Sequence, residues 1–94
     1  MADDASLLIR VFTHPACGGC GAAVQAAWQV HEANPAIVLR TVSLESKPGL
    51  DEAHAEGITT IPTMILSRGT HELARWVGSV SRAALETGVQ EAIR

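Results

Sequence analysis

The chain is poor in aromatic residues and cysteines and contains no long uninterrupted hydrophobic run. It has no tyrosine, one phenylalanine and two tryptophans, so its core must be built mainly from aliphatic side chains. No stretch approaches the roughly 18 apolar residues of a membrane-spanning helix. The beginning, MADDASLL, is acidic and lacks the basic segment and apolar run of a secretory signal. We therefore expect a cytoplasmic protein with no membrane partner.

Basic charge is also scarce. Lysine and arginine together number 7, against 10 aspartates and glutamates, and the formal net charge is −3. The basic residues are scattered along the chain instead of forming a cluster. Proteins that bind nucleic acid need a concentrated basic surface to neutralise phosphates. The composition therefore argues against a nucleic-acid partner.

Cys17 and Cys20 are the only cysteines, too few for the disulfide network of a small secreted domain. In a cytoplasmic protein a close pair of thiols usually serves catalysis or metal binding. Closing a ring of about four residues gains on the order of 2 kcal/mol, against roughly 4–5 kcal/mol for a long loop. Stability is therefore a weak reason for the pair, and the residues alone leave open a redox couple and half of a metal site.

The length of 94 residues is that of one domain, 1–94, in which we expect residues 1–6 to form a flexible N-terminus. Branched aliphatic runs predict strands, and alanine-rich or capped segments predict helices. The expected strands are 7–12, 36–44, 63–67 and 71–77, and the expected helices are about 18–34, 48–56 and 81–93. A crossover through the first helix makes the first two strands parallel, and the short turn RGT makes the last two antiparallel. The order β-α-β-α-β-β-α predicts an α/β fold, a mixed four-stranded sheet with helices on both faces.

Single residues refine this prediction. Gly57 is expected to end the second helix and Ser81 to cap the third, in which Gly88 is a weakening residue. We expect Trp76 to cover the sheet against that last helix. Strict alternation divides the strand at 71–77 into two faces, Leu73, Arg75 and Val77 against Glu72, Ala74 and Trp76.

The two cysteines fall where the first strand gives way to the first helix. Unpaired backbone N–H groups and the helix dipole stabilise negative charge at a helix N-terminus, and a thiolate of Cys17 would gain from both. Gly18 and Gly19 carry no side chain that would obstruct an incoming disulfide. Cys20 lies within reach but deeper under the helix. This asymmetry predicts that Cys17 attacks a disulfide and that Cys20 resolves the mixed disulfide.

The segments VFTHPACGGC, GITTIPT and VGSVSRAAL, in this order, resemble the thioredoxin superfamily, and most of all its small single-domain thioredoxins. The resemblance covers about residues 7–93. It implies a thioredoxin-like fold and a thiol–disulfide oxidoreductase that works in electron transport, with a redox-active Cys17–Cys20 disulfide and no other cofactor. The partners it implies are protein disulfide substrates and an upstream reductase, and we expect a monomer.

The same resemblance implies a substrate groove. The family carries a cis proline facing the active site, here Pro62, and a glycine beside it, here Gly78. An extended substrate would pair with the backbone edge at Ile61, as an added strand does. The expected substrate-binding residues are Ala16, Gly18, Gly19, Thr60, Ile61, Pro62 and Gly78.

The chain also departs from the family pattern. Ala16 stands where thioredoxins usually have tryptophan, and Gly19 stands where they have proline. By alignment, Val11 and Thr41 occupy the positions of a buried acid and its assisting lysine. Proton transfer at Cys20 would then use water, a backbone group or His14, the nearby side chain that titrates close to neutrality. His14 is accordingly a candidate for tuning the cysteines, against the plainer interpretation of a solvated loop histidine.

Two alternatives remain open. VFTHPACGGC also resembles the start of glutaredoxins and glutaredoxin-like electron donors, but GSVSR has the thioredoxin form, and we expect glutathione to be a weak ligand. A redox-sensing or metal-binding module could use His14, Cys17 and Cys20, because thiolate and imidazole suit zinc or copper. A closed structural site needs four ligands, and the other histidines are dispersed along the chain. We therefore expect no metal.

Overall fold

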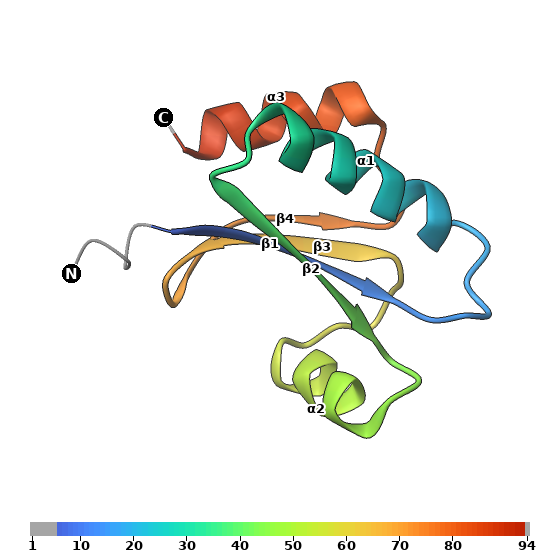
Figure 1. Ribbon diagram of the computed structural model, residues 1–94. Helices are drawn as coiled ribbons and strands as arrows, with labels where there is room; N and C mark the ends of the chain where they lie inside the picture. Colours follow the sequence, from blue (N-terminus) through green and yellow to red (C-terminus); the bar gives the residue numbers. More distant parts are fainter. Residues whose placement is uncertain (1–5, 94) are drawn as a thin grey trace.

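The computed structural model describes residues 6–93, which form a single layered unit (Figure 1). The elements are β1 (Leu7–Thr13), α1 (Cys20–Ala33), β2 (Ile37–Ser43), α2 (Lys47–Ala55), β3 (Thr63–Arg68), β4 (His71–Val77) and α3 (Arg82–Ala92). The predicted element order is confirmed. The expected flexible N-terminus, apart from Ser6, lies outside the described residues. None of the helices described here has the length and apolar character required to cross a membrane.

The four strands form one mixed sheet in the order β2-β1-β3-β4. β1 and β2 are parallel because α1 connects them as a crossover, whereas β3 pairs antiparallel with both β1 and β4. The β3–β4 turn uses Gly69 at a positive φ of 59°. Helices α1 and α3 cover one face of the sheet and α2 covers the other (Figure 1). The expected mixed sheet with helices on both faces is confirmed.

Each face of the sheet buries its own apolar cluster. The larger cluster lies under α1 and α3 and includes Ile9, Met64, Leu66, Leu85 and Val89. The smaller cluster lies under α2 and consists of Phe12, Val42, Ala53, Ile58 and Ile65. Since β3 contributes to both, its residues Thr63–Ser67 are buried without interruption. This strand begins directly after Pro62, so the backbone at Pro62 is anchored to the core.

The ends of the helices follow their capping chemistry. The Ser46 hydroxyl accepts from the Gly49 N–H at the start of α2, and the Ser81 hydroxyl accepts from the Ala84 N–H at the start of α3. Gly57 adopts φ 72° directly after α2. The expected roles of Ser81 and Gly57 are confirmed. The start of the first helix was expected near residue 18 but lies at Cys20, with Gly19 as N-cap.

Trp76 and Gly88 are matched across the β4–α3 contact. The indole of Trp76 packs against the larger cluster, as expected. A Cβ placed on Gly88 would lie 2.8 Å from Cζ2 of that indole. Gly88 therefore lowers the helix propensity of α3, but it makes room for the tryptophan.

One expectation for β4 is wrong. A register shift between Leu66 and Ser67 pairs Ser67 with Glu72 and Leu66 with Ala74, so that Leu73 is the extra residue of a β-bulge. Leu73, Ala74 and Trp76 consequently all pack on the larger cluster. Glu72 and Arg75 share the opposite face, where they are paired by hydrogen bonds of 2.8 and 2.9 Å. The bulge breaks the strict alternation that the sequence suggested.

Ion pairs attach α2 to the sheet. Arg10 of β1 contacts Glu52 at 2.9 Å and Glu56 at 2.8 Å, and Arg40 of β2 contacts Glu52 at 2.7 Å. The Arg10 side chain is only 12% exposed, so it is held mostly within the protein. Its guanidinium also lies over the Phe12 ring, 5.5 Å from the centroid. The pairs join helix and sheet through residues that lie far apart in the sequence.

Candidate active site at the Cys17–Cys20 disulfide

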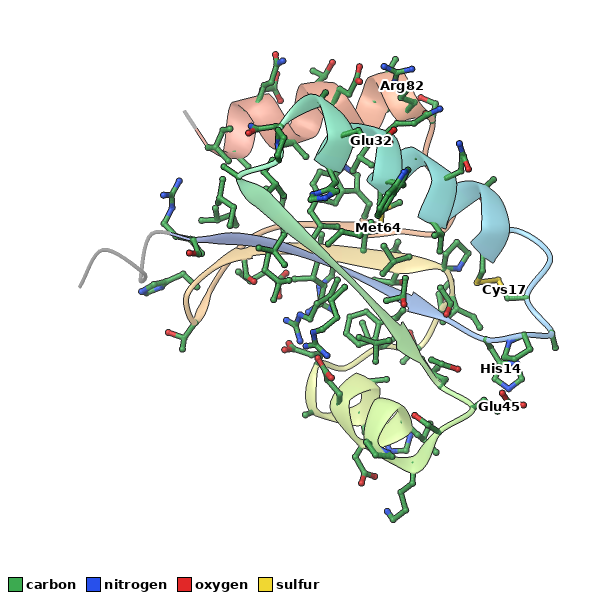
Figure 2. The ribbon with its side chains drawn as sticks, viewed as in Figure 1. His14, Cys17, Glu32, Glu45, Met64 and Arg82 are labelled. Carbon is green, nitrogen blue, oxygen red and sulfur yellow. A yellow bond between two sulfur atoms is a disulfide. The ribbon has the colours of Figure 1, made fainter. Side chains whose placement is uncertain are left out.

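Cys17 and Cys20 form a disulfide at the junction of β1 and α1 (Figure 2). Their Cα atoms lie 5.5 Å apart. Cys17 belongs to the turn and is partly exposed, whereas Cys20 is the first residue of α1 and is 5% exposed. Cys17 is therefore the more exposed of the two residues. This arrangement matches the asymmetry expected for an attacking and a resolving thiol.

Three backbone-directed hydrogen bonds shape the turn that carries Cys17. The Cys17 N–H donates to the His14 carbonyl at 2.9 Å, and the Cys20 N–H donates to the Cys17 carbonyl at 3.4 Å. The Ala16 N–H donates to Nδ1 of the His14 ring at 3.0 Å. No side chain caps the N-terminus of α1. Because Cys20 opens the helix, the disulfide adjoins the positive end of its dipole.

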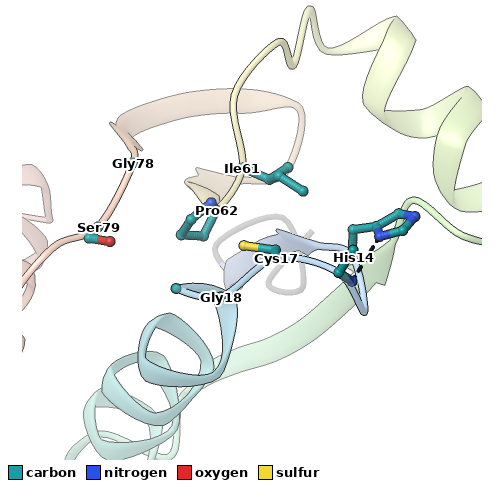
Figure 3. Close-up of a pocket in the computed structure, with 9 residues that line it drawn as sticks. His14, Cys17, Gly18, Ile61, Pro62, Gly78 and Ser79 are labelled. Atoms are coloured by element: carbon teal, nitrogen blue, oxygen red, sulfur yellow. Dashed lines mark hydrogen bonds between the residues drawn. The ribbon is translucent and has the colours of Figure 1, made fainter.

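A groove lies on the β3 side of the disulfide, with a cavity volume of about 440 Å³. The Cys17 sulfur points toward Pro62 across this groove (Figure 3). The Ile61–Pro62 peptide bond is cis, and the Pro62 carbonyl accepts from the Gly78 N–H at 2.8 Å. The lining residues are His14, Ala16, Cys17, Gly18, Gly19, Ile61, Pro62, Gly78 and Ser79. The groove thus has small side chains on both walls and no lysine, arginine, aspartate or glutamate in its described lining.

The structure brings together most of the residues expected in the groove but not all. Thr60 is absent from the lining, and its carbonyl accepts from the Thr63 hydroxyl. Ser79 was missed, although its place directly after Gly78 was the available signal. A Cβ on Gly19 would lie 3.2 Å from the Ser79 hydroxyl oxygen, so these two residues meet across the groove floor.

A second hollow, the rear hollow, opens on the β2 side of the same turn and also measures about 440 Å³. It reaches both cysteines, and its lining residues are Thr13, His14, Pro15, Cys17, Cys20, Gly21, Val24, Gln25 and Ser43. Sequence reasoning did not find it, because Ser43 and Val24 reach it from separate elements. Val11 is fully buried in the core and Thr41 is exposed on β2. Neither described hollow has a carboxylate in its lining.

The ionisable groups near the disulfide are few. His14 belongs to both linings, but Figure 3 shows its ring directed away from the Cys17 sulfur. Across residues 6–93, no three or more histidine, cysteine, aspartate or glutamate side chains gather as a metal site would require.

Comparison with known proteins gives structural neighbours only. No protein-family model matches the chain, and neither does any curated protein. Oxidised thioredoxin O2 from Arabidopsis thaliana superposes with a TM-score of 0.84 at 17% identity, over 98% of this chain and 79% of that one. Oxidised mitochondrial thioredoxin 3 from Saccharomyces cerevisiae gives 0.79 at 22% identity, over 92% and 78%. A mutant thioredoxin from Halobacterium salinarum gives 0.82 at 18% identity, over 99% and 80%. The chain has a thioredoxin-like α/β fold.

Proposed function

We propose that this protein is a thiol–disulfide oxidoreductase that reduces disulfides in other proteins, with Cys17 as nucleophile and Cys20 as resolving thiol. The observation that carries the proposal is the disulfide between a partly exposed Cys17 and a buried Cys20, facing Pro62 in a thioredoxin-like fold. A disulfide of purely structural use has no need of a groove beside one of its sulfurs.

Two exchange steps complete the reaction. The Cys17 thiolate attacks one sulfur of a partner disulfide, forms a mixed disulfide with it and releases the partner's other sulfur as a thiolate. Cys20 then loses its proton, and its thiolate attacks the Cys17 sulfur. The bond between Cys17 and the partner breaks, the second partner thiolate leaves and takes up a proton, and the Cys17–Cys20 disulfide forms. Two electrons stay with the reduced partner, and an upstream reductase supplies two others that reduce the Cys17–Cys20 disulfide again.

The groove supports an uncharged, extended substrate segment. Its described lining consists mostly of small or apolar residues, among them Ala16, Gly18 and Ile61, with His14 and Ser79 as the polar side chains. Gly18 has no neighbour within 4 Å of its Cβ position, so the approach to Cys17 is open. An extended peptide could lie along the backbone at Ile61 and bring its disulfide against Cys17.

The same lining disfavours the glutaredoxin-like alternative. Glutathione carries two carboxylates, and the described groove has no arginine or lysine to pair with them. We therefore propose that protein disulfides, not glutathione, are the substrates, and that the Cys17–Cys20 pair is the only redox group required. Comparing the rates of insulin reduction and glutathione-disulfide reduction by the reduced protein tests this preference directly.

A trapping experiment tests the assignment of the two cysteines. Cys20→Ser leaves the attacking thiol but removes the resolving one, so the mixed disulfide should accumulate on Cys17 and be detected by mass spectrometry after digestion. Cys17→Ser is the matched control and should trap no partner, because Cys20 is buried. Partner adducts found only on Cys20 of the control variant would reverse the assignment. Bound zinc together with thiols inert toward insulin would favour a metal-binding module.

A further inference from the structure

His14 makes two hydrogen bonds to the chain that follows it, and both end in the turn bearing Cys17. Its carbonyl accepts from the Cys17 N–H at 2.9 Å, and its ring Nδ1 accepts from the Ala16 N–H at 3.0 Å. Because a backbone N–H can only donate, Nδ1 must be unprotonated while the second bond exists. The ring proton of the neutral side chain is then on Nε2.

The ring does not act on the sulfur by contact. Figure 3 shows the Cys17 sulfur directed toward Pro62 and the His14 ring directed to the other side of the turn. The hydrogen bonds reach Cys17 only through the backbone of residues 14–17. Any influence of the ring on the position of the sulfur therefore passes through the shape of the turn.

We propose that His14 is the positioning residue of Cys17, and that its unprotonated Nδ1 closes the turn that directs the sulfur into the groove. The bond from a side-chain acceptor to the N–H two residues later is the one that asparagine and aspartate make in Asx-turns. Protonation of Nδ1 removes the acceptor, so the turn loosens when the imidazole becomes charged. Acid that protonates the imidazole should therefore weaken the positioning, because the Ala16 N–H loses its acceptor. The catalytic consequence depends on the function proposed above.

His14 could affect Cys17 in two ways, by positioning its sulfur through the turn or by the electrostatic effect of a charged ring, and these two effects can be distinguished. The ionisable groups of the neighbouring segments are the thiols of Cys17 and Cys20 and the carboxylate of Glu45, which follows the Leu44 that bonds to Thr13. A positively charged ring near Cys17 would raise the fraction of thiolate. Loss of the Ala16 hydrogen bond would instead lower the reactivity of each thiolate, because fewer molecules hold the sulfur in the groove. The two effects change different quantities.

Three variants test the proposal by exchange kinetics. His14→Asn keeps an acceptor that does not titrate, His14→Ala removes the acceptor, and His54→Ala removes an exposed histidine of α2 as the matched control. The measurements are the thiolate fraction, from ultraviolet absorbance, and the rate of reduction of insulin and of a small aromatic disulfide. At about pH 8, His14→Ala should react roughly two- to tenfold more slowly per thiolate than wild type, the value of one hydrogen bond. His14→Asn should stay within about twofold of wild type.

The dependence of the exchange rate on pH provides a second test of the proposal. When acid protonates the imidazole, the wild-type rate per thiolate should drop relative to that of His14→Asn toward the level of His14→Ala. The Ala16 amide resonance of the oxidised protein should follow the same titration in wild type and be independent of pH in His14→Asn. This resonance reports the hydrogen bond without reference to any activity.

Several results would overturn the proposal. It is wrong if the exchange rate per thiolate of His14→Ala equals that of wild type, or if His14→Asn is as slow as His14→Ala. It is also wrong if the Ala16 amide resonance of wild type does not change with pH. A change confined to the thiolate fraction would show that His14 acts by its charge alone. Failure of insulin reduction with normal exchange on the small disulfide would refute the proposed substrate class and leave the positioning role standing.

Discussion

At the scale of single residues, two helical glycines of this protein matter through the close contacts that they permit. A Cβ on Gly49 would lie 1.9 Å from the Ser43 carbonyl oxygen, so α2 begins in direct backbone contact with the end of β2. Gly88 makes the same kind of room for Trp76. Gly21, also helical, has nothing within 4 Å of its Cβ position. Replacing glycine by alanine should therefore have opposite effects on stability at these positions.

Gly49→Ala and Gly21→Ala should change stability in opposite directions. The alanine at residue 49 must push backbone away, and we expect the free energy of unfolding to fall by about 1–3 kcal/mol or more. The alanine at residue 21 replaces a flexible, exposed helical glycine, and we expect a gain of about 0.5–1 kcal/mol. Urea unfolding of both variants checks this. Equal stability of Gly49→Ala and wild type would show that the contact relaxes easily.

At the scale of elements, α2 is held to the sheet by charge as well as by its apolar cluster. Hydrogen bonds from Arg40, and secondly from Arg10, hold the pKa of Glu52 below its ordinary value. Arg75 lowers the pKa of Glu72 in the same way. A carboxylate whose pKa is lowered on folding stabilises the folded state above its unfolded pKa. That contribution disappears as the pH falls through the folded value.

Glu52→Gln should therefore lower stability at neutral pH and have little effect in acid. The difference in the free energy of unfolding between wild type and variant should be complete above about pH 4.3, the unperturbed glutamate value, and shrink at lower pH. Urea unfolding at neutral pH and near pH 3 measures it. Glu32→Gln, at an exposed position of α1, serves as control. A difference that persisted unchanged in acid would mean that the ionised form of Glu52 is not what stabilises α2.

At the scale of the whole molecule, the disulfide lies at one end of the fold, and neither of its cysteines is a member of the two apolar clusters. The pair closes a ring of only four residues, with a sequence separation of 3, and it bridges no two distant elements. The strand β3 contributes to both clusters and begins directly after Pro62, which lines the groove. Oxidation state and folding should therefore be weakly coupled.

Reduction of the Cys17–Cys20 disulfide should leave the fold intact. We expect the free energy of unfolding to change by about 2 kcal/mol or less, the loop-closure value of so short a ring. Urea unfolding with and without a phosphine reductant, followed by far-ultraviolet circular dichroism, measures the change. Cys17→Ser provides a permanently open control. Unfolding of the reduced protein would contradict the independence of core and disulfide.

What the sequence determined by itself is local in origin. Branched runs, alanine-rich segments, Ser81 and Gly57 were sufficient for the element order and two helix ends, because these depend on neighbouring residues. The mixed sheet followed from this order through the general rules for crossovers and short turns. The CGGC segment between a strand and a helix was sufficient to predict which cysteine is accessible. These features depend on propensity, capping and periodicity.

The tertiary structure alone decided what depends on residues far apart in the chain. The bulge at Leu73, the contact of Trp76 with Gly88 and the ion pairs of Arg10 required the register and packing of the whole sheet. The absence of Thr60 from the groove and the rear hollow beside Cys20 were likewise invisible in the sequence. Even the His14–Ala16 bond, short in sequence, depends on side-chain direction in the folded turn. The spacing of residues in the sequence limits which of them can come into contact, and the packing of the folded chain decides which contacts form.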